Sequence, residues 1–400
     1  MNDDYPRFQA SLTRRNVLKS LAGAAALQVM PQALADSMQP ATLANSINPR
    51  WYGFNLLDYF STDPDWMKYF PIKNDGEFEE NDFRWMRDWG FNWVRLPMDY
   101  RFWTSATDPK KIYEKKIEPI DRAIRLGEQY GIHVNICLHR APGECILDGM
   151  DEAVTGIRIS KESTNVYKEP QALEAFNHQW SYFAARYKGI ANTKLSFNLV
   201  NEPLEAGKSY PAGKQDYARV ATAAIHAIRQ KDPTRLIITD GYPAGMGTIP
   251  KLSPLTVMQS CHDYLPFQLT HYQNPWARSF VGNVPMPTWP LKDQNGKVIF
   301  DKASLEKTFA PWASLAQHGV PIHFGEIGCD HNTPPDVMYA WYNDTLDVIS
   351  GLRSGWGLWN FRGSFGILDS NRKGTQYRDW YGHELDVQLL DLLKRKMKAA

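Results

Sequence analysis

The chain has 400 residues, of which 43% are hydrophobic and 22% are charged, a composition ordinary for a globular protein. Its 45 Lys and Arg residues nearly balance its 44 Asp and Glu residues, for a formal net charge of +1. Nucleic acids and anionic membranes usually require a basic excess, so we expect neither as a partner. Aromatic residues make up 13% of the chain, and their faces fill cores or stack on sugar rings.

The N-terminal residues predict an export signal. Thr13-Arg14-Arg15-Asn16-Val17-Leu18-Lys19 is a twin-arginine pattern, and a short apolar stretch follows it from Leu21 to Met30. This stretch is about half of the roughly 20 residues that span a bilayer. Ala33 and Ala35 are the small residues that a signal peptidase requires, so we expect cleavage after residue 35. We therefore expect the Tat export machinery of a bacterium to deliver a mature chain, residues 36–400, to the periplasm or the medium without a membrane anchor.

Eight short apolar or β-branched runs follow, and each predicts a β-strand. In chain order they are Trp51–Leu57, Asn92–Pro97, His133–His139, Leu195–Asn201, Arg235–Asp240, Val257–His262, Ile322–Glu326 and Gly355–Asn360. Several are almost continuously apolar, as expected for strands that are buried on both faces of a parallel sheet. Helical periodicity marks the stretches Pro170–Lys188, Gln215–Gln230, a helix that begins at Pro334 and Pro335, and Leu385–Leu393.

Eight strand-and-helix units in this length predict an α/β fold, a (β/α)8 TIM barrel with extended βα loops. A doubly wound sheet is the alternative, but no GxGxxG or Walker loop follows any of the strands. No internal repeat or low-complexity linker divides the chain. We therefore expect a single catalytic domain over residues 36–400.

Polar and aromatic side chains stand at the carboxyl ends of six predicted strands, where the loops that carry the chemistry of such a barrel gather. These ends contain Arg95, His139, Asn201-Glu202, His262-Asp263-Tyr264, Glu326 and Trp359-Asn360. Packing or a buried ion pair explains each of them singly. Six such ends on one rim instead predict a functional site.

Two carboxylates stand out among these residues, because each of them ends an apolar approach. Glu202 ends the fourth strand and Glu326 ends the seventh, so we expect them to face each other across the barrel mouth. A carboxylate in such a place is costly unless it is paired or functional. Carboxyl groups about 5 Å apart suit double-displacement glycoside hydrolysis. We expect Arg95 to keep one of them ionised and burial to keep the other protonated.

The segment Leu195-Ser196-Phe197-Asn198-Leu199-Val200-Asn201-Glu202-Pro203 resembles the Asn-Glu-Pro motif of glycoside hydrolase family 5, the cellulase family within a large clan of barrels. The resemblance extends from Gly53-Phe54-Asn55 to Trp359. In register with the motif stand Arg95, His139, His262-Asp263-Tyr264, Gly325-Glu326 and Trp359.

The resemblance implies a retaining hydrolase of β-linked glucan or gluco-oligosaccharide that uses neither a metal nor a cofactor. It implies that Glu202 is the acid/base and Glu326 the nucleophile. The resemblance also implies roles in substrate binding. Asn201 would contact the sugar 2-hydroxyl, and Arg95 and Tyr264 would hold the nucleophile. His139 and His262 would line the same subsite, and the sugar would stack on Trp359.

The sequence departs from the family at two points. Asn360 follows Trp359 where some members carry a carboxylate, and Leu138–Gly143 differs from common endoglucanase sequences. We also find no carbohydrate-binding module or Ser/Pro linker, so we expect action on soluble glucan or oligosaccharide rather than on solid cellulose.

Three alternative functions remain open. A β-mannan or β-mannoside hydrolase would use the same scaffold, since the choice depends on contacts to the sugar 2-hydroxyl. A metal-dependent barrel hydrolase is less favoured, because the first strand lacks a His-x-His pair and only His262-Asp263 and Asp330-His331 are close neighbours. A non-catalytic sugar-binding barrel has no need of both Glu202 and Glu326.

The four cysteines are Cys137, Cys145, Cys261 and Cys329, and they form no CxxC pair or zinc spacing. Cys137 and Cys145 are the closest pair in the sequence. An oxidising destination allows disulfides, and four buried thiols remain equally compatible with the sequence.

Overall fold

The computed structural model describes residues 50–57, 78–105, 107–144, 164–204, 213–274, 277, 281–282 and 284–399. All of these belong to one compact unit, Pro40–Ala400. The predicted signal peptide and Cys145 lie outside the described residues. Among the described cysteines, Cys137, Cys261 and Cys329 are buried and form no disulfide.

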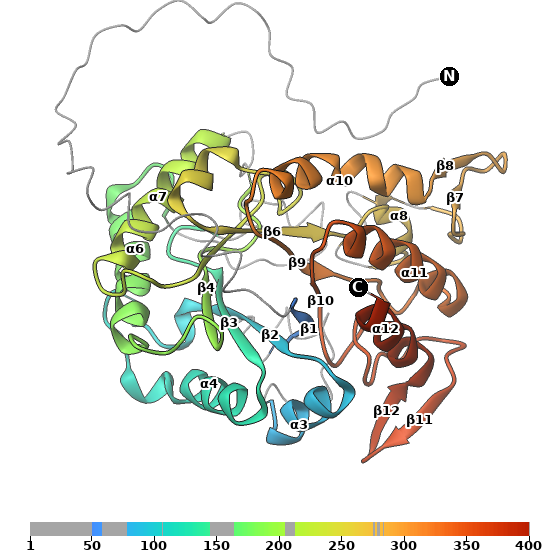
Figure 1. Cartoon of the computed structure of the whole chain (residues 1–400), viewed down its shortest axis with the longest axis horizontal. Coiled ribbons are helices and arrows are strands. Elements are labelled where there is room, and N and C mark those ends of the chain that lie inside the picture. Colours follow the sequence, from blue (N-terminus) through green and yellow to red (C-terminus); the bar gives the residue numbers. More distant parts are fainter. Residues whose placement is uncertain are drawn as a thin grey trace, which may run out of the picture. The chain divides into compact units, whose positions relative to one another are not determined.

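Eight parallel strands close into a barrel in the order β1-β10-β9-β6-β5-β4-β3-β2 (Figure 1). They are β1 (Tyr52–Asn55), β2 (Trp93–Asp99), β3 (His133–Arg140), β4 (Leu195–Asn198), β5 (Ile237–Asp240), β6 (Met258–Asp263), β9 (Ile322–Ile327) and β10 (Trp356–Leu358). Each overlaps one of the eight strands predicted from the sequence, and the prediction of a (β/α)8 barrel is confirmed.

Helices cover the outside of the barrel (Figure 1). They are α3 (Glu80–Trp89), α4 (Glu118–Tyr130), α6 (Pro170–Arg186), α7 (Lys214–Arg229), α8 (Phe267–Thr270), α10 (Lys302–Gln317), α11 (Pro335–Gly351) and α12 (Val387–Ala399). The described residues also form three short 3-10 helices, η3 (Tyr100–Phe102), η4 (Glu114–Lys116) and η5 (Pro250–Leu255). Two hairpins complete the described elements: β7 (Leu291–Lys292) with β8 (Val298–Phe300), and β11 (Tyr377–Trp380) with β12 (His383–Asp386). Among these, no helix is long and apolar enough to span a membrane.

The structure differs from the predicted alternation at two places. The crossover from β5 to β6 contains η5 instead of an α-helix, and Pro254 within it cannot donate the hydrogen bond that an α-helix requires. The predicted helix at Leu385–Leu393 begins later, at Val387, because Leu385 and Asp386 still belong to β12. The Asp386 carboxylate then accepts a hydrogen bond from the Leu389 backbone N–H at 2.8 Å, which satisfies one donor in the first turn of α12.

Aromatic packing closes the barrel near the amino ends of its strands. The fully buried Trp93 side chain lies against Gly357 of β10, and its ring centroid is 4.7 Å from that of His323 on β9. A Cβ atom on Gly357 would stand 2.2 Å from the Trp93 ring, and one on Gly53 would stand 1.7 Å from the Trp93 carbonyl oxygen. Only glycine lets the backbones of β1 and β10 approach Trp93 this closely. Gly53 and Gly357 therefore fix where β1, β2 and β10 meet.

A β-bulge marks the pairing of β6 with β9. His262 pairs with Glu326 while Cys261 pairs with Phe324, so Gly325 is the extra residue. A Cβ atom on Gly325 would stand 2.4 Å from the Ser260 hydroxyl oxygen. Bulges redirect the side chains that follow them, and this one places Glu326 beside His262 at the carboxyl end of the barrel.

Candidate active site

The buried guanidinium of Arg95 connects several strand ends. Its Nη1 donates to Glu326 Oε1 at 2.5 Å and to Asn55 Oδ1 at 3.0 Å. Its Nε donates to Asn198 Oδ1 at 2.8 Å, and its Nη2 donates to Asn201 Oδ1 at 2.9 Å. One planar fork of donors therefore joins the ends of β1, β2, β4 and β9.

Both oxygens of the Glu326 carboxylate accept hydrogen bonds. Arg95 donates to Oε1, and the Tyr264 hydroxyl donates to Oε2 at 2.8 Å. The His262 Nδ1 atom lies 3.5 Å from Oε1. Donors on both oxygens hold the carboxylate in one orientation and favour its ionised form.

Glu202 lies directly beyond β4 and is held differently. Its backbone has a positive φ of 43°, a conformation that non-glycine residues rarely adopt. Its backbone N–H donates to Asp240 Oδ2 at 3.0 Å. Its Oε1 lies 2.8 Å from His262 Nδ1, and its side chain is 14% exposed. Glu202 therefore has the His262 ring and the Asn201 amide as side-chain neighbours, and it has access to the barrel mouth.

The two carboxyl groups are close neighbours. An oxygen of Glu202, the His262 Nδ1 atom and an oxygen of Glu326 all lie within 4.8 Å of one another. A separation of about 5 Å is the one that double-displacement glycosidases use. The same three atoms have the spacing of cation ligands, but Arg95 already bonds to Glu326 Oε1, so a cation there would meet a fixed positive charge. We therefore assign no metal to this group.

The surroundings of the two carboxyl groups change their pKa values to different extents. Burial raises the pKa of Glu202 to about 8, and the Asp240 charge adds to this rise while Arg95 opposes it. Burial also raises the pKa of Glu326, with His262 and Arg95 opposing the rise. As expected, Arg95 stands beside one of the two carboxylates and favours its ionised form, although burial outweighs the guanidinium in the net direction of the pKa of Glu326. Glu202 is the carboxyl group that remains protonated at neutral pH.

The other predicted side chains lie around this pair. The ring of His139 lies 5.6 Å from that of Trp359, at an interplanar angle of 34°. The Trp359 backbone N–H donates to the carbonyl of Ile327, next to Glu326. The Asn201 Nδ2 atom is buried and has no hydrogen-bond partner of ordinary geometry among the described residues. The structure thus brings together all eight side chains that the sequence analysis selected: Arg95, His139, Asn201, Glu202, His262, Tyr264, Glu326 and Trp359.

The sequence analysis missed four residues of this network. Asn55, Cys137, Asn198 and Asp240 are all buried, and all contact Arg95. Asn55 and Asp240 end β1 and β5, so the rule that selected six polar strand ends applied to these two as well. Nothing in the sequence distinguishes Cys137 or Asn198 from an ordinary strand residue.

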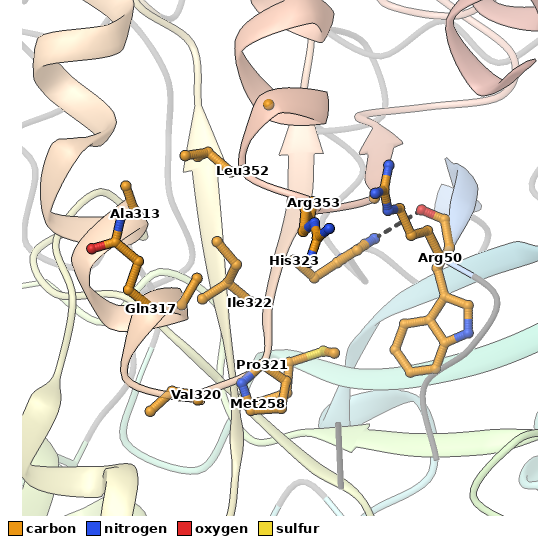
Figure 2. Close-up of a pocket in the computed structure, with 15 residues that line it drawn as sticks. Arg50, Met258, Ala313, Gln317, Val320, Pro321, Ile322, His323, Leu352 and Arg353 are labelled. Atoms are coloured by element: carbon orange, nitrogen blue, oxygen red, sulfur yellow. Dashed lines mark hydrogen bonds between the residues drawn. The ribbon is translucent and has the colours of Figure 1, made fainter. Parts of the chain in front are cut away.

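A separate pocket of about 750 Å³ lies at the opposite end of the barrel. It is lined at the amino ends of β1, β6, β9 and β10 by Trp51, Met258, Ile322 and Gly355. Figure 2 shows Arg353 and His323 on one side of this pocket and Ala313 and Gln317 on the other. Carboxylates are absent from its lining, and residues at this end of a TIM barrel usually serve stability.

Comparison with known proteins gives consistent results. The family model described as "Cellulase (glycosyl hydrolase family 5)" matches residues 50–364. Endoglucanase C of Acetivibrio thermocellus is 22% identical over 337 residues, which cover 77% of this chain and 92% of that protein. Cellodextrinase A of Ruminococcus flavefaciens is 26% identical over 281 residues, or 69% of this chain and 76% of that protein. A crystal structure described as a glycoside hydrolase superposes with a TM-score of 0.76 at 36% identity, covering 87% of this chain and 99% of the other.

Proposed function

The chain belongs to the cellulase family, glycosyl hydrolase family 5, so it is a retaining glycoside hydrolase, and we propose that its substrate is a β-linked glucan or gluco-oligosaccharide. The family resemblance inferred from the sequence is confirmed. Relatives named as an endoglucanase and a cellodextrinase, each aligned with more than two thirds of its own length, support the choice of glucan.

In the proposed reaction, Glu326 is the nucleophile. Its carboxylate attacks the anomeric carbon, the bond to the leaving oxygen breaks, and a covalent glycosyl-enzyme forms with inversion. The contacts of Arg95 and Tyr264 with its two oxygens support this role, because they orient the carboxylate before substrate binds. Both donors also stabilise the carboxylate when it leaves the sugar in the second step.

Glu202 is the proposed acid/base. In the first step it gives its proton to the leaving oxygen, and in the second step it takes a proton from the water that attacks the anomeric carbon. A pKa of about 8 supports this role, because the group then carries a proton at neutral pH. The spacing of Glu202 and Glu326 carries the proposal most directly, because it fits attack by a carboxylate rather than by an intervening water.

Asn201 and Trp359 are the proposed contacts with the reacting sugar. Arg95 donates to Asn201 Oδ1, which fixes the orientation of the amide, so Nδ2 stands on the side of Glu202 and can donate to a sugar hydroxyl. Trp359 offers an aromatic face of the size of a sugar ring, with His139 beside it. His262 lines the same subsite through its contact with Glu202.

Hydrolysis of a substrate panel tests the function. Purified enzyme is assayed on soluble β-glucans, cello-oligosaccharides, β-mannans and aryl glycosides. We expect cleavage of glucans, and a loss of at least about 1,000-fold in Glu202→Gln and Glu326→Gln on substrates with natural leaving groups. Glu114→Gln, which changes an exposed carboxylate on the outside of the barrel, is the matched control.

Three outcomes would contradict parts of this proposal. Exclusive cleavage of mannans would replace glucan by mannan. Full activity of either active-site variant, with unchanged thermal unfolding, would remove that residue from its role. Sugar binding by wild type without any cleavage would favour a binding barrel.

We also propose that residues 1–35 are a Tat signal peptide and that the mature enzyme acts in the periplasm or outside the cell. The twin arginines Arg14 and Arg15 and the small residues Ala33 and Ala35 support this localisation. Residues 1–35 fused to a reporter protein should carry it into the bacterial periplasm. The Arg14→Lys, Arg15→Lys double variant should leave the reporter in the cytoplasm, and export of both fusions alike would contradict the Tat assignment.

A further inference from the structure

Asp240, the last residue of β5, lies beneath the proposed acid/base and is fully buried. Its Oδ1 accepts from Asn198 Nδ2 at 2.8 Å, and its Oδ2 accepts from the Glu202 backbone N–H at 3.0 Å. The Arg95 Nη2 atom lies 3.6 Å from Oδ2. All three neighbours are donors, so they suit an ionised Asp240 carboxylate.

His262 lies between Asp240 and Glu202. Its Nε2 is 3.3 Å from Asp240 Oδ2, and its Nδ1 is 2.8 Å from Glu202 Oε1. Burial lowers the pKa of His262, so the ring is neutral and carries one N–H. The approach of Nε2 to Asp240 lacks hydrogen-bond geometry, yet a carboxylate oxygen at 3.3 Å favours electrostatically the tautomer with its hydrogen on Nε2. Nδ1 is then an acceptor, and only a protonated Glu202 can donate to it.

We propose that Asp240 is a positioning residue for the acid/base, which selects the His262 tautomer and thereby keeps the proton on Glu202. This inference rests on the proposed function, in which Glu202 protonates the leaving group. Asp240 also accepts a hydrogen bond from the Glu202 backbone N–H. This contact holds the positive-φ backbone of Glu202 in the position that lets its side chain reach His262.

The loop that follows β5 holds the histidine ring in this arrangement. The Gly245 carbonyl accepts from the His262 backbone N–H at 3.1 Å. A Cβ atom on Gly245 would stand 2.7 Å from the His262 Cβ and 2.8 Å from its Cγ. The bare backbone of Gly245 therefore packs directly against the ring, so β5 and its loop fix both partners of Glu202.

The charges around the pair determine the direction of the effect. The titratable groups that interact with Asp240 or Glu202 come from several neighbouring elements. They are Arg95 on β2, Cys137 on β3, Tyr217 on α7, Cys261 and His262 on β6, Tyr264 directly after β6, and Glu326 on β9. Asp240 raises the pKa of Glu202, while Arg95 lowers it. Burial raises the pKa of Glu202 most, and neutralising Asp240 removes the charge that adds to this rise, so the pKa of Glu202 falls.

The variant Asp240→Asn tests the inference through the pH profile of kcat/KM. The amide oxygen of the variant takes the place of Oδ2, so it still accepts from the Glu202 N–H and faces His262 Nε2, but it carries no charge. The variant therefore weakens the preference for a hydrogen on Nε2 and removes a charge that raises the pKa of Glu202. We expect the basic limb to move down by about one pH unit. At pH 8.5 such a shift lowers the protonated fraction of Glu202 about eightfold, so we expect a loss of about eightfold on cello-oligosaccharides but less than about twofold on dinitrophenyl cellobioside, whose leaving group needs no proton.

Two further variants separate positioning from simple structural support. Asp240→Glu keeps the charge and should keep the basic limb of wild type. Asp232→Asn is the matched control, since Asp232 is a buried carboxylate that pairs with Arg235 just before the other end of β5. It should leave the pH profile unchanged. An unmoved basic limb in Asp240→Asn, with equal losses on both leaving groups, would overturn the inference.

If Asp240→Asn does not fold, a measurement on the wild-type enzyme tests the same inference. In ¹⁵N-histidine-labelled enzyme, with the His262 signals assigned from His262→Gln, we expect the hydrogen on Nε2 and a bare Nδ1. A hydrogen on Nδ1 would overturn the inference. Failure of wild type to cleave any β-glucoside would overturn the proposed function instead, so the two failures are distinguishable.

Discussion

Glu202 and Glu326 have the same side chain, and their neighbours give them different properties. Both oxygens of Glu326 accept hydrogen bonds, one of them from a guanidinium. Glu202 contacts the neutral ring of His262 and the Asn201 amide through its side chain, and it lies near the Asp240 charge. The donors on Glu326 oppose the effect of burial on its pKa, whereas burial and the Asp240 charge together raise the pKa of Glu202 to about 8 and favour its carboxylic acid form. This difference allows two identical residues to act as nucleophile and acid.

The pH profile of kcat/KM should therefore be bell-shaped. Activity requires an ionised Glu326, so it rises as the pH increases through an acidic limb above the ordinary glutamate value of 4.5. Activity also requires a protonated Glu202, so it falls as the pH increases through a basic limb near 8. The two limbs belong to the coupled pair. A basic limb near pH 5 would contradict the assignment of Glu202.

Arg95 should be essential for stability as well as for activity. Its replacement by Met leaves the buried Glu326 carboxylate without its ion pair, and removing one partner of a buried pair costs about 3 kcal/mol or more. We expect urea unfolding of Arg95→Met to show a loss of this size and the variant to lack activity. Arg125→Met, which breaks an exposed pair with Glu118, should cost less than about 1 kcal/mol. Equal losses in the two variants would show that burial of the Arg95 pair does not matter.

Among the elements, β5 and its loop have the strictest steric requirement near the site. Gly245 has φ of 76°, and a methyl group there meets the His262 side chain. Gly245→Ala should lose about 1–3 kcal/mol of unfolding free energy and should lower kcat by displacing the ring. Gly131→Ala is the control, because Gly131 has φ of 68° but open space around its Cβ position. It should lose stability from backbone strain alone and keep its kcat.

The strands were predictable because each is a short apolar run in a fold that repeats one unit. The helix expected between β5 and β6 was not formed, because prolines in η5 prevent an α-helix there. The hairpins β7–β8 and β11–β12 were not predicted, since Leu291–Lys292 and Val298–Phe300 are too short and too exposed to form an apolar pattern. Sequence periodicity thus finds the buried elements and misses the exposed ones.

At the scale of the whole molecule, the site forms where strands far apart in sequence end on one rim. The rule of polar strand ends located eight side chains of the site before any contact was known. The contact of Arg95 with one of the two carboxylates was expected, but the rule could not show that the same guanidinium also bonds to Asn55 and Asn198. It also passed over Asp240, because a lone aspartate at a strand end is typical of a turn.

Removal of metal ions should leave activity unchanged. The Glu202, His262 and Glu326 atoms have the spacing of cation ligands, but the chemistry proposed for them needs only proton transfer and covalent attack. Dialysis against EDTA followed by assay on soluble β-glucan checks this. A loss of activity that zinc or another divalent ion restores would favour the metal-dependent alternative.

The most direct test of the central claim is chemical rescue of Glu326→Gly by azide. The truncated variant lacks a nucleophile, so on an activated aryl β-glycoside it should be inactive alone. Added azide should occupy the vacated space, restore turnover and give a glycosyl azide of inverted anomeric configuration. Rescue with that product identifies Glu326 as the nucleophile. Unimpaired hydrolysis by Glu326→Gly without azide would show that another group attacks the sugar.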